Sequence, residues 1–127
     1  MSQPAEFLVI SRGQWDPDAP KEEIQTAIDD FYAWLGGLID EGKMKPGERL
    51  GTGGAMVTRE QILTDGPFGE AKEVIGGYWF IRANSLAEAA QLAAGNPCLQ
   101  YGLRYEIRPL ALEKASAFDV TNETPVG

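Results

Sequence analysis

The sequence predicts an α+β domain in which two helices cover one face of an antiparallel sheet. Four short segments are apolar or alternate between apolar and polar residues, as strands do. Two longer segments repeat apolar residues three and four positions apart, as helices do. These segments follow the order strand, helix, strand, strand, helix, strand, with a hairpin inserted after the second strand. The 127 residues suffice for one such domain and its core.

The first half of the chain predicts a strand, a long helix and a second strand. Residues 7–10 form an apolar run typical of a strand buried on both faces. Pro20 suits the first turn of a helix whose apolar positions recur from residue 24 to residue 39. Within that helix Gly36-Gly37 indicates either a close approach by a neighbouring element or a locally soft helix. Residues 43–50 are expected to form the second strand.

The second half predicts a hairpin, a central strand, a helix and a last strand. Residues 55–58 and 61–64 form the hairpin, and residues 78–83 form a strand that is apolar on both faces. The spacing of Ser85 and Glu88 is that of a capping box, which opens a helix that ends before Pro97. In residues 103–108, apolar and charged side chains alternate, so one face of the last strand is charged.

This order is the split βαβ pattern of a ferredoxin-like sandwich with an extra hairpin. The domain is expected to span residues 1–110, and residues 111–127 are expected to be a mobile tail or one that docks on a partner subunit. Two helices can cover only one face of the strands at 7–10 and 78–83. We therefore expect a second copy of the chain to cover the other face, which makes the protein a homodimer.

Composition excludes several classes of partner and cofactor. Eleven basic and nineteen acidic residues give a formal charge of −8, which argues against binding to nucleic acid or to anionic membranes. The chain has no histidine and a single cysteine, Cys98, so no metal site, cofactor or internal disulfide is expected. It has no apolar run of about 18 residues, the length that a membrane-spanning helix needs, and it opens without a secretory signal. We expect a cytoplasmic protein.

Five residues are candidates for a site, and each has a structural alternative. Asp65 opens a Gly-Pro turn, where it either bonds its own backbone or faces a pocket. Lys72 lies between Glu70 and Glu73 in a segment that is either a solvated loop or part of the pocket. Three further candidates lie on strands. Tyr78 is either a core residue or a platform for a ligand. Glu106 and Arg108 either pair with each other or bind a polar ligand, which a sheet-on-sheet dimer would enclose.

Several motifs in a fixed order resemble the DGPF-type branch of the YCII-related family, over about residues 6–110. They are the segments 64–68, 70–73, 76–78 and 85–89, then Pro97, Gly102 and the segment 106–109. The resemblance implies a dimeric α+β barrel and a distant relationship to muconolactone-isomerase-like and monooxygenase-like enzymes. It also implies a context near extracytoplasmic-function sigma factors. YCII relatives with assigned chemistry are associated with a His-Asp pair, of which only Asp65 has a counterpart here.

Two functions follow from these residues. The first is a binding or regulatory module that holds a small polar molecule in a cleft at the dimer barrel. The second is a small lyase-like or isomerase-like enzyme, with Asp65 as general base and Arg108 stabilising an anionic intermediate. We favour the first. An aspartate has an ordinary pKa of about 3.9 and must be buried to act as a base at neutral pH, and no histidine can replace it.

Overall fold

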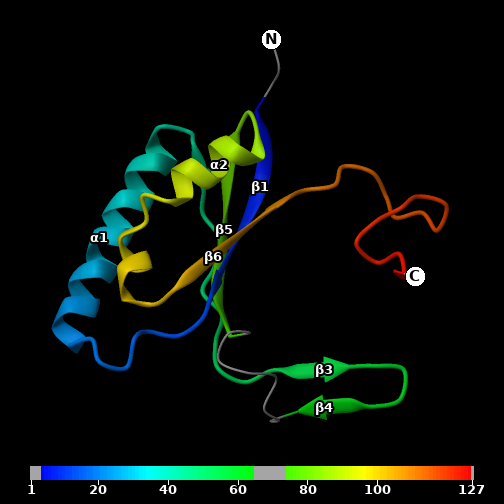
Figure 1. Ribbon diagram of the computed structural model, residues 1–127, viewed down its shortest axis with the longest axis horizontal. Coiled ribbons are helices and arrows are strands. Elements are labelled where there is room, and N and C mark those ends of the chain that lie inside the picture. Colours follow the sequence, from blue (N-terminus) through cyan, green and yellow to red (C-terminus); the bar gives the residue numbers. More distant parts are fainter. Residues whose placement is uncertain (1–3, 65–73, 127) are drawn as a thin grey trace.

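The computed structural model describes residues 4–64 and 74–126 and confirms the α+β class (Figure 1). The strands that build the main sheet alternate with two α-helices, and a short hairpin is inserted between the second and third of them. In chain order the elements are β1 (Ala5–Arg12), α1 (Lys21–Asp40), β2 (Met44–Lys45), β3 (Ala55–Val57), β4 (Ile62–Thr64), β5 (Ile75–Ala83), α2 (Leu86–Ala93), the 3₁₀ helix η2 (Pro97–Tyr101) and β6 (Arg104–Pro109).

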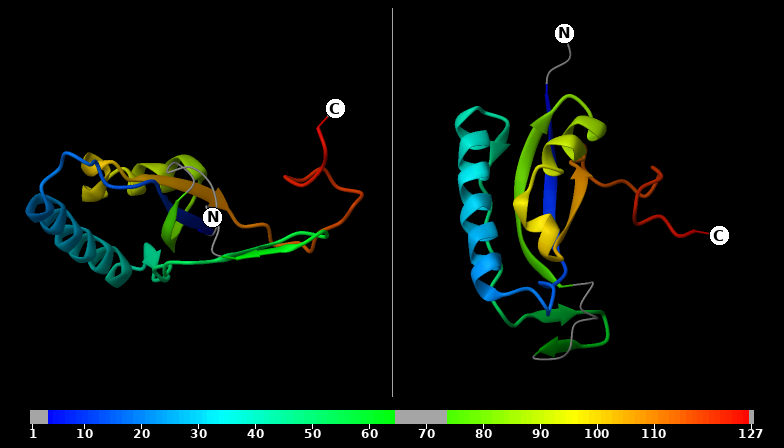
Figure 2. Two further views of the ribbon diagram at one scale, coloured as in Figure 1. Left: turned by 90° about the horizontal axis from the view of Figure 1, so that it is seen from below. Right: turned by 60° about the vertical axis from the view of Figure 1, so that its left-hand side comes forward.

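The main sheet has four strands in the order β2-β5-β1-β6, and each neighbouring pair is antiparallel. β5 lies between β1 and β2, so the unit β1-α1-β2 is split by a strand from the second half of the chain. The register of the central pair runs from Ala5 opposite Ala83 to Arg12 opposite Ile75. Both helices lie on one face of this sheet (Figure 1, Figure 2).

The core lies between the sheet and the helices, because side chains alternate across each strand. Alternate residues of β1 and β5 are buried on the helix face, and these are Phe7, Val9, Trp79 and Ile81. The residues between them are half-buried on the opposite face, which we call the open face, and include Leu8, Ile10, Tyr78 and Phe80. Both strands are therefore apolar on both faces, as the sequence indicated.

Local signals in the sequence correctly predicted where both α-helices begin. Pro20 precedes the first residue of α1, and the Ser85 Oγ accepts a hydrogen bond from the Glu88 N–H at 3.1 Å. The close approach considered for Gly36-Gly37 is absent among the described residues, because a Cβ on either glycine would meet no atom within 4 Å. The locally soft helix is the alternative that remains.

One expected element differs from the structure, and one element was not expected. Only Met44–Lys45 of the expected strand at 43–50 pairs as a strand, because Pro46 has no N–H to donate. The chain then rejoins the sheet at a single bridge, where Arg49 lies opposite Gly77. After α2 the chain forms η2, which the sequence analysis missed, and the Asn96 Oδ1 caps it by accepting a hydrogen bond from the Cys98 N–H at 2.9 Å.

Two segments extend from the body on the side opposite the helices (Figure 1, Figure 2). The expected hairpin is confirmed as β3 and β4, which form a separate two-stranded sheet with Ala55 opposite Thr64. Every residue of both strands is exposed. After β6, residues 110–126 contain turns but no helix or strand, and we call this segment the tail.

Candidate ligand-binding cavity

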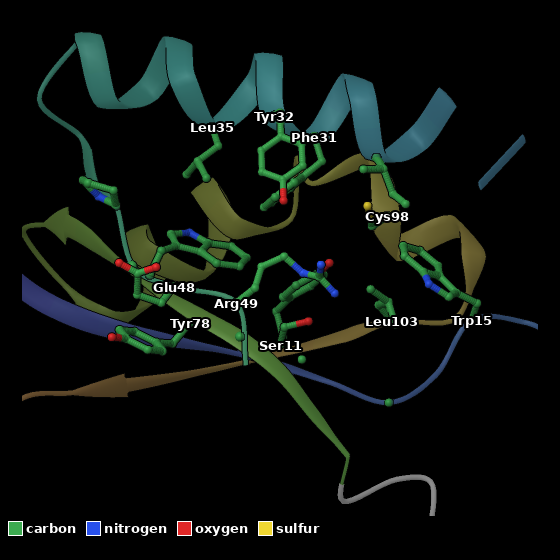
Figure 3. A pocket seen from close by; sticks show the side chains of 18 of the residues that line it. Ser11, Trp15, Phe31, Tyr32, Leu35, Glu48, Arg49, Tyr78, Cys98 and Leu103 are labelled. Atoms are coloured by element: carbon green, nitrogen blue, oxygen red, sulfur yellow. The ribbon is translucent and has the colours of Figure 1, made fainter. Parts of the chain in front are cut away.

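A cavity of about 860 Å³ lies between α1 and the sheet (Figure 3). Its volume falls within the usual range for small-molecule sites, roughly 300–1,000 Å³. Aromatic and aliphatic side chains form most of its wall, and a few polar side chains interrupt them. The apolar group is Trp15, Ile28, Phe31, Tyr32, Leu35, Trp79 and Leu103, and the polar group is Ser11, Gln14, Glu48, Arg49, Cys98 and Tyr105.

Two glycines bring the segment 46–50 against β5 and so form one wall of the cavity. The Tyr78 N–H donates to the Glu48 carbonyl at 3.0 Å. A Cβ on Gly47 would lie 2.0 Å from the Tyr78 carbonyl oxygen, and a Cβ on Gly77 would lie 2.8 Å from the Glu48 carbonyl oxygen. Only glycine permits this approach at both positions. The two glycines therefore fix the backbone that carries Arg49.

The Arg49 side chain extends into the cavity between α1 and the sheet (Figure 3). Most other cations of the sheet have a carboxylate partner, but Arg49 has none within residues 4–64 and 74–126. The neighbouring Glu48 lines the same cavity, but its carboxylate lies well apart from the guanidinium (Figure 3). A guanidinium presents up to five donors in a planar fork, which suits a carboxylate or phosphate. The cavity therefore offers a site for an anionic group.

A second polar cluster lies where β6 meets η2. Burial raises the pKa of Tyr105 well above its ordinary value of 10, and the Tyr105 hydroxyl interacts with Ser11 and Cys98. Burial also raises the pKa of the Cys98 thiol, an effect that the hydrogen bond with Tyr105 opposes. Cys98 Sγ donates to the Ala27 carbonyl at 3.7 Å. At neutral pH Tyr105 is thus a neutral donor, and Cys98 is a thiol rather than a nucleophilic thiolate.

Trp79 forms the centre of the aromatic wall. Its ring centroid lies 5.3 Å from that of Phe31 and 5.4 Å from that of Tyr105. Its indole Nε1–H is buried and has no hydrogen-bond partner in the part of the chain that the structure describes. A ligand in the cavity can therefore contact the Trp79 ring, whereas the buried N–H faces away from the open space.

Of the three sequence candidates that the structure describes, it brings one to this cavity. Tyr78 is among the cavity residues, although its ring pairs with Phe80, at 6.0 Å between centroids, on the open face. Asp65 and Lys72 lie outside the described residues. Their roles stay predictions, as do those of Glu106 and Arg108, which do not line the cavity.

Glu106 and Arg108 belong instead to an ion-pair network on the open face. Glu106 binds Arg12 through one carboxylate oxygen and Arg108 through the other, the second at 3.1 Å. Hydrogen bonds from Arg12 and then Arg108 hold the pKa of Glu106 below its ordinary value of 4.5. This is the pairing that the sequence analysis gave as the alternative to ligand binding.

The sequence analysis did not identify Arg49, Ser11 or Tyr105 as site residues. Arg49 lay inside an expected strand, and Tyr105 was assigned to the apolar face of the last strand. One signal was present for Arg49, because Gly47 precedes it closely and Gly76-Gly77 opens the strand against which it lies. Within residues 4–64 and 74–126, no group of three acidic or cysteine side chains is placed to hold a metal ion. Neither described helix is long and apolar enough to cross a bilayer.

The fold and the cavity together define an α+β domain with an aromatic site between helix and sheet. The YCII-related domain matches residues 12–111, and the chain belongs to the YCII-related family. It is also 37% identical over 103 residues to an uncharacterized protein of Rhizobium meliloti (strain 1021), an alignment that covers 74% of this chain and 81% of that protein. Because that relative is itself uncharacterized, the function must be argued from the cavity.

Proposed function

We propose that the protein is a small-molecule-binding domain whose ligand is compact, largely apolar and carries one anionic group. The observation that carries this proposal is the Arg49 guanidinium, which lies in an aromatic cavity of about 860 Å³ without a carboxylate partner among the described residues. Arg49 binds the anionic group, and the rings of Phe31 and Trp79 contact the apolar part of the ligand. A carboxylic acid with a ring or a short branched chain meets these requirements.

A neutral donor on the wall of the cavity would orient such a ligand. Burial keeps the Tyr105 phenol protonated, so it can donate a hydrogen bond to a carbonyl or ether oxygen. A ligand that carries a hydrogen-bond acceptor besides its anionic group could bind both Tyr105 and Arg49.

Binding is favoured over catalysis because the cavity groups with raised pKa are not bases. Cys98 and Tyr105 are both protonated at neutral pH. The general base of the enzyme alternative, Asp65, lies outside the described residues, and Arg108 is paired on the open face. The lyase-like or isomerase-like activity therefore stays a prediction, as do the sigma-factor context and the cytoplasmic location.

Within the family we propose the DGPF-type branch and a homodimer in which two open faces pack together as a dimeric α+β barrel. The open face supports this assembly because it carries the apolar stripe Leu8, Ile10, Tyr78 and Phe80 without a covering helix. The sheet order β2-β5-β1-β6 supports the ferredoxin-like architecture on which such barrels are built. In this assembly each subunit keeps its own cavity, since the cavity lies on the helix side of the sheet.

A thermal-shift screen of small carboxylic acids tests the proposed function. A ligand at about 100 times its Kd stabilises the native state by about 2.7 kcal/mol, so a true ligand raises the Tm by several degrees. Arg49→Ala should weaken the affinity for that ligand about 10-fold to 100-fold, because a charge-assisted hydrogen bond contributes about 1.5–3 kcal/mol. Arg59→Ala, which removes an exposed guanidinium from the hairpin, is the control and should leave the affinity unchanged. Equal affinity in both variants would refute the role of Arg49.

A further inference from the structure

The hairpin β3-β4 and the tail leave most of their large apolar side chains exposed. In the hairpin, Met56, Val57, Ile62 and Leu63 are 45–69% exposed. In the tail, Leu112, Phe118, Val120 and Val126 are at least 92% exposed, and Leu110 is 41% exposed. Both segments lie on the side of the open face (Figure 1, Figure 2). We refer to them together as the arms.

The hairpin is too small to be stable by itself. It consists of two strands of three residues, and an isolated two-stranded hairpin is at best marginally stable in water. Met56 pairs with Leu63 on one of its faces, and Val57 pairs with Ile62 on the other. Both faces are therefore apolar, and the hairpin requires a second surface against which to pack.

The charges of the tail complement those of the open face. The tail is acidic, with Glu113, Asp119 and Glu123 against Lys114. The open face has an excess of cations although the whole chain has a formal charge of −8. Its charged residues, apart from Arg104, are Arg12, Lys45, Arg82 and Arg108 against Glu6 and Glu106. An acidic, apolar segment therefore matches a basic, apolar surface of the same chain.

The tail is also long enough to cross a facing sheet. It begins after β6, which is an edge strand of the main sheet. Residues 111–126 can extend about 50 Å, at roughly 3.3 Å per residue. Four strands spaced about 4.8 Å apart are about 19 Å wide. The tail of one copy can therefore reach any strand of a facing sheet.

We propose that the arms of each copy dock against the open face of a second copy, at the margins of the contact between the two sheets. This proposal rests on the homodimer proposed above and identifies the segments that hold it. A two-fold axis that brings two open faces together places the arms of each subunit beside the sheet of its partner. The apolar side chains of the arms would bury about 500–1,100 Å² per copy, at roughly 60–120 Å² each. That area brackets the roughly 800 Å² per partner of a stable complex.

A matched pair of tail variants tests this inference by sedimentation equilibrium. Leu112→Asp/Phe118→Asp places two charges on apolar positions, and the control Ala115→Asp/Ala117→Asp adds the same charge at small exposed positions. We expect the dimer Kd to rise at least about tenfold in the first variant and less than about threefold in the control. Circular dichroism should match the unmodified chain in both, because the tail lies outside the core. A dimer unaffected by the first variant overturns the docking of the tail and leaves the homodimer standing, whereas a monomeric unmodified chain overturns both.

A crosslinking experiment identifies the surface on which the tail docks. Phe118 is replaced by the photoreactive residue p-benzoylphenylalanine, and isotopically light and heavy chains are mixed before irradiation. The proposal predicts crosslinks between light and heavy chains, with the attachment on β1, β5 or β6. Crosslinks confined within one chain would show that the tail folds onto its own sheet. Dimers without crosslinks to these strands would equally overturn the proposal.

Discussion

At the scale of single residues, the position of Arg49 depends on glycines that carry no chemistry themselves. Gly47 and Gly77 allow two backbone segments to approach more closely than any Cβ permits. The approach lets the Tyr78 N–H reach the Glu48 carbonyl and the Leu50 N–H reach the Gly76 carbonyl, at 3.0 and 2.9 Å. These bonds flank Arg49 and hold it at the cavity wall. Glycine here is selected by a neighbouring backbone rather than by a turn.

Alanine at two glycine positions should therefore have opposite effects on stability. Gly47→Ala places a Cβ 2.0 Å from the Tyr78 carbonyl oxygen, so the backbone must shift, and we expect a loss of about 1–3 kcal/mol or more. Gly36→Ala in α1 meets no atom within 4 Å and should add about 0.5–1 kcal/mol through helix propensity. Urea unfolding of both variants measures the two changes. If the Gly47→Ala variant has an unchanged free energy of unfolding, the segment 46–50 does not pack against β5 as closely as described.

At the scale of elements, the sequence predicted well what short-range signals determine. The Ser85 cap, Pro20 before α1 and the hairpin strands were all readable from neighbouring residues. The second strand was predicted to be longer than it is, because neither the apolar pattern nor a typical strand length reveals where pairing with β5 stops. The cavity could not be predicted because its walls come from α1, β1, β5, β6 and η2, which meet only in the folded chain. Its polar groups follow no sequence spacing.

The ion-pair network on β6 should make stability depend on acid pH. Hydrogen bonds from Arg12 and Arg108 lower the pKa of Glu106 in the folded state, so folding favours its ionised form. This contribution is complete above the ordinary pKa of 4.5 and is lost as the pH falls through the lower folded value. The difference in unfolding free energy between the unmodified chain and Glu106→Gln should thus shrink as the pH falls from about 6 to about 3. A difference that is constant across this range, in urea unfolding, would contradict the role of the network.

At the scale of the whole molecule, the two faces of β5 have different surroundings. Trp79 and Ile81 pack the sheet against its helices, whereas Tyr78 and Phe80 face outward. Phe80 lies between Leu8 and Lys45, whose Nζ is 5.6 Å from the Phe80 ring centroid. The alternation of β5 predicted that both faces need cover, but it did not reveal which residue faces the helices. The register with β1 resolves this, because Phe80 lies opposite the half-buried Leu8 and Trp79 lies opposite the buried Val9.

Aspartate at two adjacent positions of β5 should therefore separate folding from assembly. Trp79→Asp buries a carboxylate in the core, where Trp79 is only 5% exposed, and we expect the subunit to lose its cooperative unfolding transition. Phe80→Asp changes the open face, so the subunit should stay folded by circular dichroism, and its mass by light scattering should fall from twice 13.8 kDa to 13.8 kDa. Arg82→Ala, further along the same face, controls for a general effect of altering this strand and should weaken the dimer less. A folded Phe80→Asp variant that remains dimeric at micromolar concentration would mean that the two copies do not meet through this face.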